Sequence, residues 1–97
     1  MAEACNSSGV LSTSTVVSKS RVRITSLHVT STANALFTLK VFDSDSSSTS
    51  GKKEVARVVV HAGGTAETME QYMGGVICNN GIYAELTGTG TVSINYA

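Results

Sequence analysis

The stretch that decides the fold is GIYAELTGTGTVSINY, residues 81–96. In its first half Ile82, Ala84 and Leu86 share one parity, and apolar residues again take every second position from Val92 onward. A period of two is typical of strands with one buried face, because successive side chains point to opposite faces. The Gly-Thr-Gly segment between the halves predicts a turn. We therefore expect two antiparallel strands joined as a hairpin.

Two stretches nearer the N-terminus also have strand character. Residues 10–18 form a weak extended segment in which apolar positions do not alternate cleanly. In residues 21–30 the apolar positions change parity between Ile24 and Leu27. One inserted residue switches the two faces of a strand, so this change indicates a β-bulge around Thr25–Ser26.

Two Val- and Leu-rich stretches follow. Residues 36–42 place Phe37, Leu39 and Val41 on the expected core face, and a polar loop comes next. Residues 54–61 carry valines on both faces. That pattern fits a central strand or a strand covered by a neighbouring subunit.

The segment from residue 62 to residue 81 is the most ambiguous part of the chain. Residues 62–65 interrupt the strand pattern, and residues 67–73 fit either a single helical turn or another strand. Gly74–Gly75 is expected to end that element. Asn79–Gly81 predicts a tight turn, because these residue types tolerate positive φ.

The predicted fold is all-β: a single antiparallel β-sandwich, jelly-roll or Greek-key-like, of seven to eight short strands. We assign residues 1–20 to an extended N-terminal arm or first strand, and residues 21–97 to the sandwich domain. The sequence of 97 residues contains no proline. Because proline and charge protect exposed sheet edges, some edges are expected to be covered in an assembly.

The charge pattern argues against nucleic-acid and membrane partners. Net charge is zero, and the densest basic clusters are Lys19 with Arg21 and Arg23, and Lys52 with Lys53. Neither cluster has an aromatic stacking platform, so both are interpreted as solvated surface.

No stretch approaches the length of a membrane span, and the N-terminus lacks signal-peptide features, which favours a cytosolic protein. Near-neutral charge also permits self-association.

The two cysteines, Cys5 and Cys78, are not predicted to form a disulfide or a zinc site. Cys78 follows two apolar residues, and a buried thiol there is expected to act as a small hydrophobe. A reducing compartment disfavours a bridge, and the pair lacks nearby histidines.

Two apparent sites also have simpler explanations. Residues 43–54 place Asp43, Asp45 and Glu54 at calcium-loop positions, but serine replaces the required central glycine. A Ser–His–Asp set can be assembled from His28 or His61 with either aspartate, yet no nucleophile-elbow motif is present. We therefore predict no catalytic, metal or cofactor-binding residues and no cofactor.

Some apolar and aromatic residues are candidate contacts. Met69, Tyr72 and Met73 are interpreted as closing one end of the sandwich, with a partner surface as the alternative. Phe42 is either a contact or an aromatic at the core edge, and Tyr83 is the best candidate for an outward-facing aromatic.

Residues 21–97 resemble a group of small β-sandwich proteins encoded among the virion genes of tailed bacteriophages. The resemblance rests on RITSLHV (23–29), on ALFTLKVFD (35–43) leading into a polar loop, and on the ending at 81–96. The serine-rich loop at 44–50 departs from the pattern.

This resemblance implies a non-enzymatic virion protein similar to head decoration, or cement, proteins. Such proteins form symmetric oligomers, often homotrimers, and bind the major capsid protein between capsomers on the capsid surface after assembly in the host cytoplasm. The alternative is a glycan-binding or ring-forming subunit of the tail, fibre or neck.

Overall fold

The computed structural model describes residues 6–31, 36–61 and 67–97, which form eight strands and no helix. The strands are β1 (Asn6–Ser7), β2 (Thr15–Ser18), β3 (Val22–Ser31), β4 (Leu36–Asp43), β5 (Lys53–His61), β6 (Glu67–Cys78), β7 (Ile82–Thr87) and β8 (Gly90–Tyr96).

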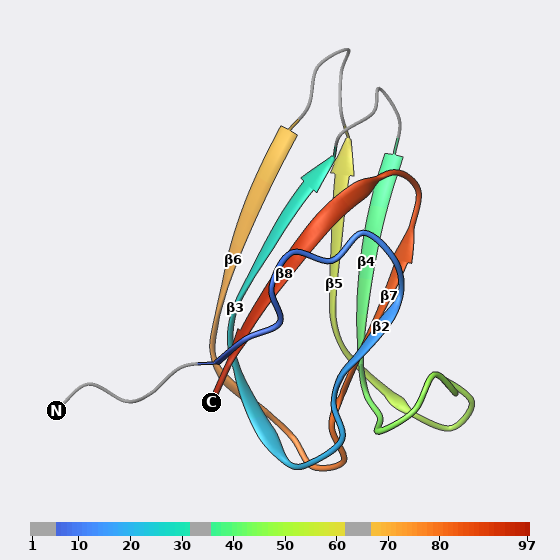
Figure 1. Ribbon diagram of the computed structural model, residues 1–97, viewed down its shortest axis with the longest axis vertical. Coiled ribbons are helices and arrows are strands. Elements are labelled where there is room, and N and C mark those ends of the chain that lie inside the picture. The colour runs from blue at the N-terminus through green and yellow to red at the C-terminus, as the bar shows by residue number, and fades with distance from the viewer. Residues whose placement is uncertain (1–5, 32–35, 62–66) are drawn as a thin grey trace, which may run out of the picture.

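Two four-stranded antiparallel sheets pack face to face (Figure 1). Sheet A has the order β1-β8-β3-β6, and sheet B has the order β2-β7-β4-β5. Among the described strands, β4 and β5 are the one sequence-adjacent pair joined within a sheet, and the other connections cross between the sheets. This is the strand order of a jelly roll, and it confirms the predicted sandwich.

The predicted hairpin over residues 81–96 is wrong, although both of its strands are present. β7 lies between β2 and β4 in sheet B, whereas β8 lies between β1 and β3 in sheet A. The connection crosses between the sheets at one end of the sandwich through Gly88, whose φ is +104°, and Gly90. A Cβ on Gly90 would lie 2.5 Å from the Thr30 carbonyl oxygen and 2.7 Å from the Phe37 ring. The glycines therefore serve a close crossing between sheets and not a two-strand turn.

The Asn79–Gly81 segment likewise joins different sheets. It leads from β6 in sheet A to β7 in sheet B. Among the described residues positive φ is confined to glycines, including Gly81 at +147°. The two asparagines therefore do not form the hairpin turn that their sequence predicted. Instead, their backbone N–H groups donate to the Asp43 carboxylate at 3.1 and 2.8 Å.

The bulge near Thr25 is confirmed. The register of β3 shifts between Ile24 and Ser26 against both β6 and β8. The Thr25 hydroxyl donates to the Asn95 carbonyl at 3.0 Å, which gives the interrupted ladder a hydrogen bond. Ile24 and Leu27 are both fully buried, so the bulge keeps the core face continuous across the change of parity.

Residues 67–73 belong to a strand and not to a helical turn. β6 also continues through Gly74–Gly75, which was expected to end the element. Opposite the β3 bulge, Ile24 pairs with Val76 and Ser26 pairs with Tyr72, so β6 accommodates the glycines as extra residues. Pairing along the whole of β3 explains why the strand prevails over a short helix that has no packing partner of its own. The structure describes residues 67–73 as a strand without describing their side chains, so the contacts proposed for Met69, Tyr72 and Met73 lie outside the described part of the protein.

β5 is an edge strand, so its interpretation as a central strand is wrong. Its Val58 and Val60 face the core, whereas its Val59 points outward and is 43% exposed. Valines on both faces here reflect an apolar outer surface at the edge of sheet B.

The segment before β3 contributes to both sheets. β1 pairs with β8, Leu11 forms an isolated bridge with Val92, and β2 pairs with β7. The core between the sheets is aliphatic apart from Phe37, with additional members Ile24, Leu27, Val29, Leu39, Val41, Val58, Val60, Cys78, Ile82, Ala84, Val92 and Ile94.

Candidate interaction surfaces

The outer face of sheet B combines an aromatic pair with charged residues. Phe42 pairs with Tyr83 and Lys40 pairs with Glu85 across β4 and β7. The two aromatic rings stack with centroids 6.3 Å apart and an interplanar angle of 29°. Such a pair stabilises the sheet beyond the area that it buries.

Tyr83 lies on the expected outward face but is not accessible. Only 8% of it is exposed, because Phe42 and the neighbouring strand β2 cover it. A sugar-binding aromatic must present a free ring face, so Tyr83 does not provide one. Phe42 is half-buried against it, which fits an aromatic at the edge of the core.

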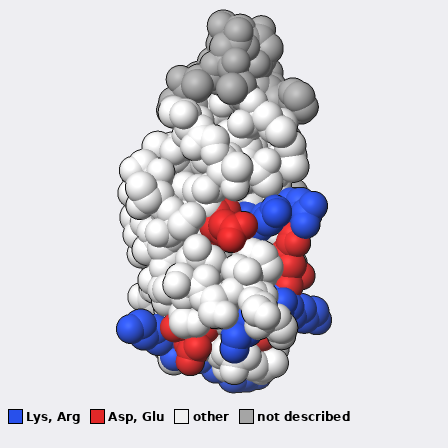
Figure 2. Space-filling model, turned by 90° about the vertical axis from the view of Figure 1, so that its right-hand side faces the viewer, with Lys and Arg blue, Asp and Glu red and all other residues white. Residues whose placement is uncertain are grey.

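Charges on this side of the molecule alternate in sign. Arg57 donates to both Glu54 carboxylate oxygens, at 2.7 and 2.8 Å. This hydrogen bonding lowers the pKa of Glu54 and raises the pKa of Arg57. Figure 2 shows acidic and basic groups side by side here, with uncharged surface around them. The face therefore lacks the single-sign field that a nucleic-acid partner requires.

The apolar part of this face lies where β4 begins and β5 ends. Leu36 is 48% exposed and Val59 is 43% exposed. Across β4 and β5, Val59 lies opposite Thr38, and His61 lies opposite Leu36. Leu36 and Val59 are therefore diagonal neighbours on the same face of the sheet. In the part of the chain that the structure describes, β5 has no strand on its other side. Exposed apolar side chains therefore adjoin an open sheet edge.

The outer face of sheet A is polar around His28, in β3 and β8. Asn95 donates through Nδ2 to the Ser26 hydroxyl at 3.0 Å, and His28 Nε2 lies 3.5 Å from that hydroxyl and 3.4 Å from Asn95 Nδ2. Asp43, in contrast, ends β4 in the other sheet. The structure thus brings His28 to a serine and an asparagine but not to the aspartate proposed for a catalytic set. The side chain of His61 lies outside the described residues.

The acidic residues of the 43–54 loop have separate surroundings. Asp43 is 8% exposed and accepts the Asn79 and Asn80 N–H groups, whereas Glu54 binds Arg57 and Asp45 is solvent-exposed. The described residues contain no group of three acidic, histidine or cysteine side chains placed to hold a metal ion.

Cys78 is fully buried, as its apolar sequence context predicted. Burial, and then the nearby Asp43 charge, raises its pKa to about 11. The thiolate is the reactive form, so at pH 8 Cys78 in folded protein should alkylate roughly a hundredfold more slowly than in urea. Iodoacetamide labelling of the Cys5→Ser variant, followed by mass spectrometry, measures this directly. Equal rates with and without urea would contradict the burial. Cys5 itself lies outside the described residues.

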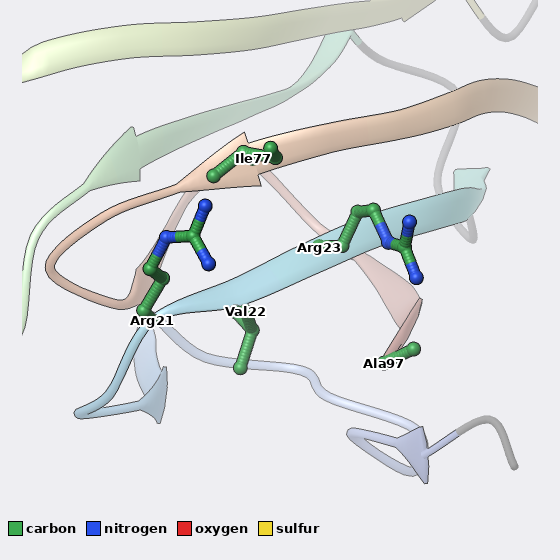
Figure 3. A pocket seen from close by; sticks show the side chains of 5 residues that line it. All are labelled: Arg21, Val22, Arg23, Ile77 and Ala97. Carbon is green, nitrogen blue, oxygen red and sulfur yellow. The ribbon is translucent and has the colours of Figure 1, made fainter.

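A hollow of about 340 Å³ lies where β3 begins and β6 ends, lined by Arg21, Val22, Arg23, Ile77 and Ala97. In Figure 3 the side chains of Arg21, the residue before β3, and of Arg23 in β3 extend on the side of Ile77, and that of Val22 extends on the opposite side. Sequence reasoning interpreted these arginines as solvated surface and overlooked Ile77, which is 49% exposed. The direct pairing of Arg23 with Ile77 across β3 and β6 brings the two regions together.

Comparisons with protein-family models, with curated proteins and with solved structures found no match. In the described residues there is no helix long and apolar enough to cross a membrane.

Proposed function

We propose that this protein is a structural component of a bacteriophage particle, a decoration protein that binds the major capsid protein between capsomers and stabilises the head. The observation that carries the proposal is the open edge of β5 with exposed Val59 beside Leu36. An edge strand has unpaired backbone N–H and C=O groups, which favour pairing with another chain. The adjoining apolar patch would be removed from water on association, which makes the association more favourable.

The charges on β5 are compatible with this role. Charged residues commonly protect edge strands, and β5 carries Lys53, Glu54 and Arg57. Glu54 and Arg57 already neutralise one another through a bidentate pair on the outer face. Val59, further along the same face, carries no charge, so the edge is only partly protected.

Self-association follows from the same surface. We propose a homo-oligomer, a trimer, in which β5 and its patch contact a neighbouring copy. Several linked contacts on a repeating lattice give avidity that a single contact lacks, so a modest patch is sufficient. A ring-forming neck subunit would use the same sheet edges. A glycan-binding module is less well supported, because Tyr83, the best candidate for a sugar-binding aromatic, is covered.

The test measures how many copies of the protein are present in purified phage particles. Phage particles from a host that carries the gene are purified on a density gradient, and the protein is quantified against the major capsid protein by mass spectrometry. A decoration protein is expected at many copies per head, and removing it should lower the temperature at which heads release DNA. Presence at about a dozen copies, or absence from the particles, would contradict decoration.

The Val59→Lys variant tests the surface. We expect it to weaken self-association by about tenfold or more, because burying an unpaired ammonium costs more than the roughly 1.4 kcal/mol that tenfold requires. Light scattering should give a mass near three times 10.0 kDa for the wild type and a lower mass for the variant. Ser93→Lys adds the same charge to the outer face of sheet A and serves as the control. Equal behaviour of the two variants would exclude the β5 surface.

A further inference from the structure

We propose that the sides of β8 and β7 covered by residues 6–18 are a binding site for the same segment of a second copy, so that copies exchange these segments. Residues 6–18 (the strap) pair through β1 with β8 and through β2 with β7. Figure 1 shows the strap in blue, running from sheet A to sheet B. It lies at the opposite end of each sheet from β5 and β6, so the inference is independent of the β5 surface.

The strap is held mainly by its main chain. Leu11 and Val92 exchange two backbone hydrogen bonds, at 2.7 and 2.8 Å, and the Ser8 N–H donates to the Ile94 carbonyl at 2.8 Å. The β2 part adds a short ladder with β7. All residues from 6 to 20 are at least partly exposed, although Leu11 packs against the core. A segment with few buried contacts opens at a lower free energy than the core strands, so the strap is expected to detach before the sandwich unfolds.

Two serine hydroxyls make the site specific for this segment. Just beyond β1, the Ile94 N–H donates to Ser8 Oγ at 2.9 Å. Just before β2, the Leu86 N–H donates to Ser14 Oγ at 3.0 Å. An occupant therefore needs hydroxyls at these two positions, with an apolar residue between them at the position of Leu11 and a crossing from one sheet to the other. A second copy of this chain meets all of these requirements because its strap has the same sequence.

Exchange preserves these contacts, because each bond between the strap and β7 or β8 can also form between two chains. The turn between β2 and β3 must open. That turn is exposed, and the Ser18 hydroxyl donates to the Ser20 carbonyl at 3.2 Å and accepts the Ser20 N–H at 3.3 Å. Water replaces such local bonds at low net cost. Neighbouring copies at high local concentration therefore compete with the chain's own strap.

The experiment traps the strap of one chain on β8 of another. Ser7 is the register partner of Asn95, so single cysteines at these positions meet when a strap lies on β8. Ser7→Cys and Asn95→Cys are made separately in the Cys5→Ser background and mixed in urea with reductant. They are refolded together at about 1 mM, the effective concentration of a short flexible linker. Oxidation follows folding, when Cys78 is buried.

Neither chain carries both new cysteines, so a bridge between residues 7 and 95 must join two copies. We expect this mixed dimer to predominate over both homodimers, and its yield to fall when refolding is carried out at lower protein concentration. Mass spectrometry of the bridged peptides identifies it. Ser18→Ala should raise its yield, because that substitution removes both bonds that hold the turn.

Ser47→Cys, in the exposed loop before β5, replaces Ser7→Cys as the control and should reach residue 95 only at the level of random collision. Asn6→Cys with Tyr96→Cys is a second register pair, used if a variant of the first pair does not fold. A mixed-dimer yield no higher than that of the Ser47 control would overturn the exchange. A yield that Ser18→Ala leaves unchanged would do the same.

Discussion

Replacing Gly81 with alanine is expected to destabilise the protein by about 3 kcal/mol or more. The residue has a φ of +147°, and its added Cβ would overlap the Ser18 carbonyl oxygen and lie 3.0 Å from the Ser44 carbonyl oxygen. Both neighbours are backbone atoms, so neither can rotate away. Backbone strain and overpacking each cost roughly 1–3 kcal/mol, and here they add. Urea unfolding followed by circular dichroism measures the change.

Gly51→Ala provides the matched control. Gly51 has a φ of +72°, but nothing lies within 4 Å of an added Cβ. Only the strain of the backbone conformation applies to this variant, so its free energy of unfolding should fall by about 1 kcal/mol. If the two variants had equal unfolding midpoints, the close approach of residue 81 to the end of β2 would be contradicted. The free energy of unfolding of a natural domain is roughly 5–15 kcal/mol, so the larger destabilisation, that of Gly81→Ala, is measurable.

Phe37→Ala should cost about 3–5 kcal/mol, the usual range for emptying a buried aromatic site. Phe37 is fully buried and is the largest such side chain among the described residues. Its ring also lies against the crossing between β7 and β8, within 3.4 Å of a Cβ placed on Gly88 and 2.7 Å of one on Gly90. Because both of these residues lack side chains, they cannot fill the cavity. Thermal and urea unfolding should both report the loss.

Phe42→Ala removes the same side chain from the other face of β4. Phe42 is half-buried and contacts Tyr83 on the outer surface, so less than half the loss of Phe37→Ala is expected. Similar losses for the two variants would mean that the outer face is as well packed as the core. That result would also point to a covering partner on sheet B.

The strands and their faces could be predicted from the sequence because side-chain alternation is a local property. The parity change between Ile24 and Leu27 identified the bulge, and Phe37 and Val41 were placed correctly in the core. The strands with which β7 and β8 each pair could not be predicted in this way, because alternation shows which face is buried and not which strand lies alongside. In residues 67–73 helix and strand spacing are both possible, and only long-range pairing with β3 decides between them.

The candidate surfaces were partly predictable for the same reason. Valines on both faces of residues 54–61 indicated a strand with an apolar outer side, although its edge position was missed. The exposure of Tyr83 depends on packing against Phe42 and β2, which no local pattern records. Arg23 and Ile77 are far apart in sequence and meet only through the register of β3 and β6.

The strand order also sets when this protein can fold. β8 fills the gap between β1 and β3, and β7 fills the gap between β2 and β4. Until the last two strands have left the ribosome, each sheet lacks an inner strand and its neighbours have unsatisfied edges. Pairings between distant segments, such as Asn6 with Tyr96, require closure of long loops before they contribute stability. Folding of this domain is therefore expected to wait until β8 has been synthesised and to be slow for a small domain. In the meantime its exposed strand edges need protection from other nascent chains.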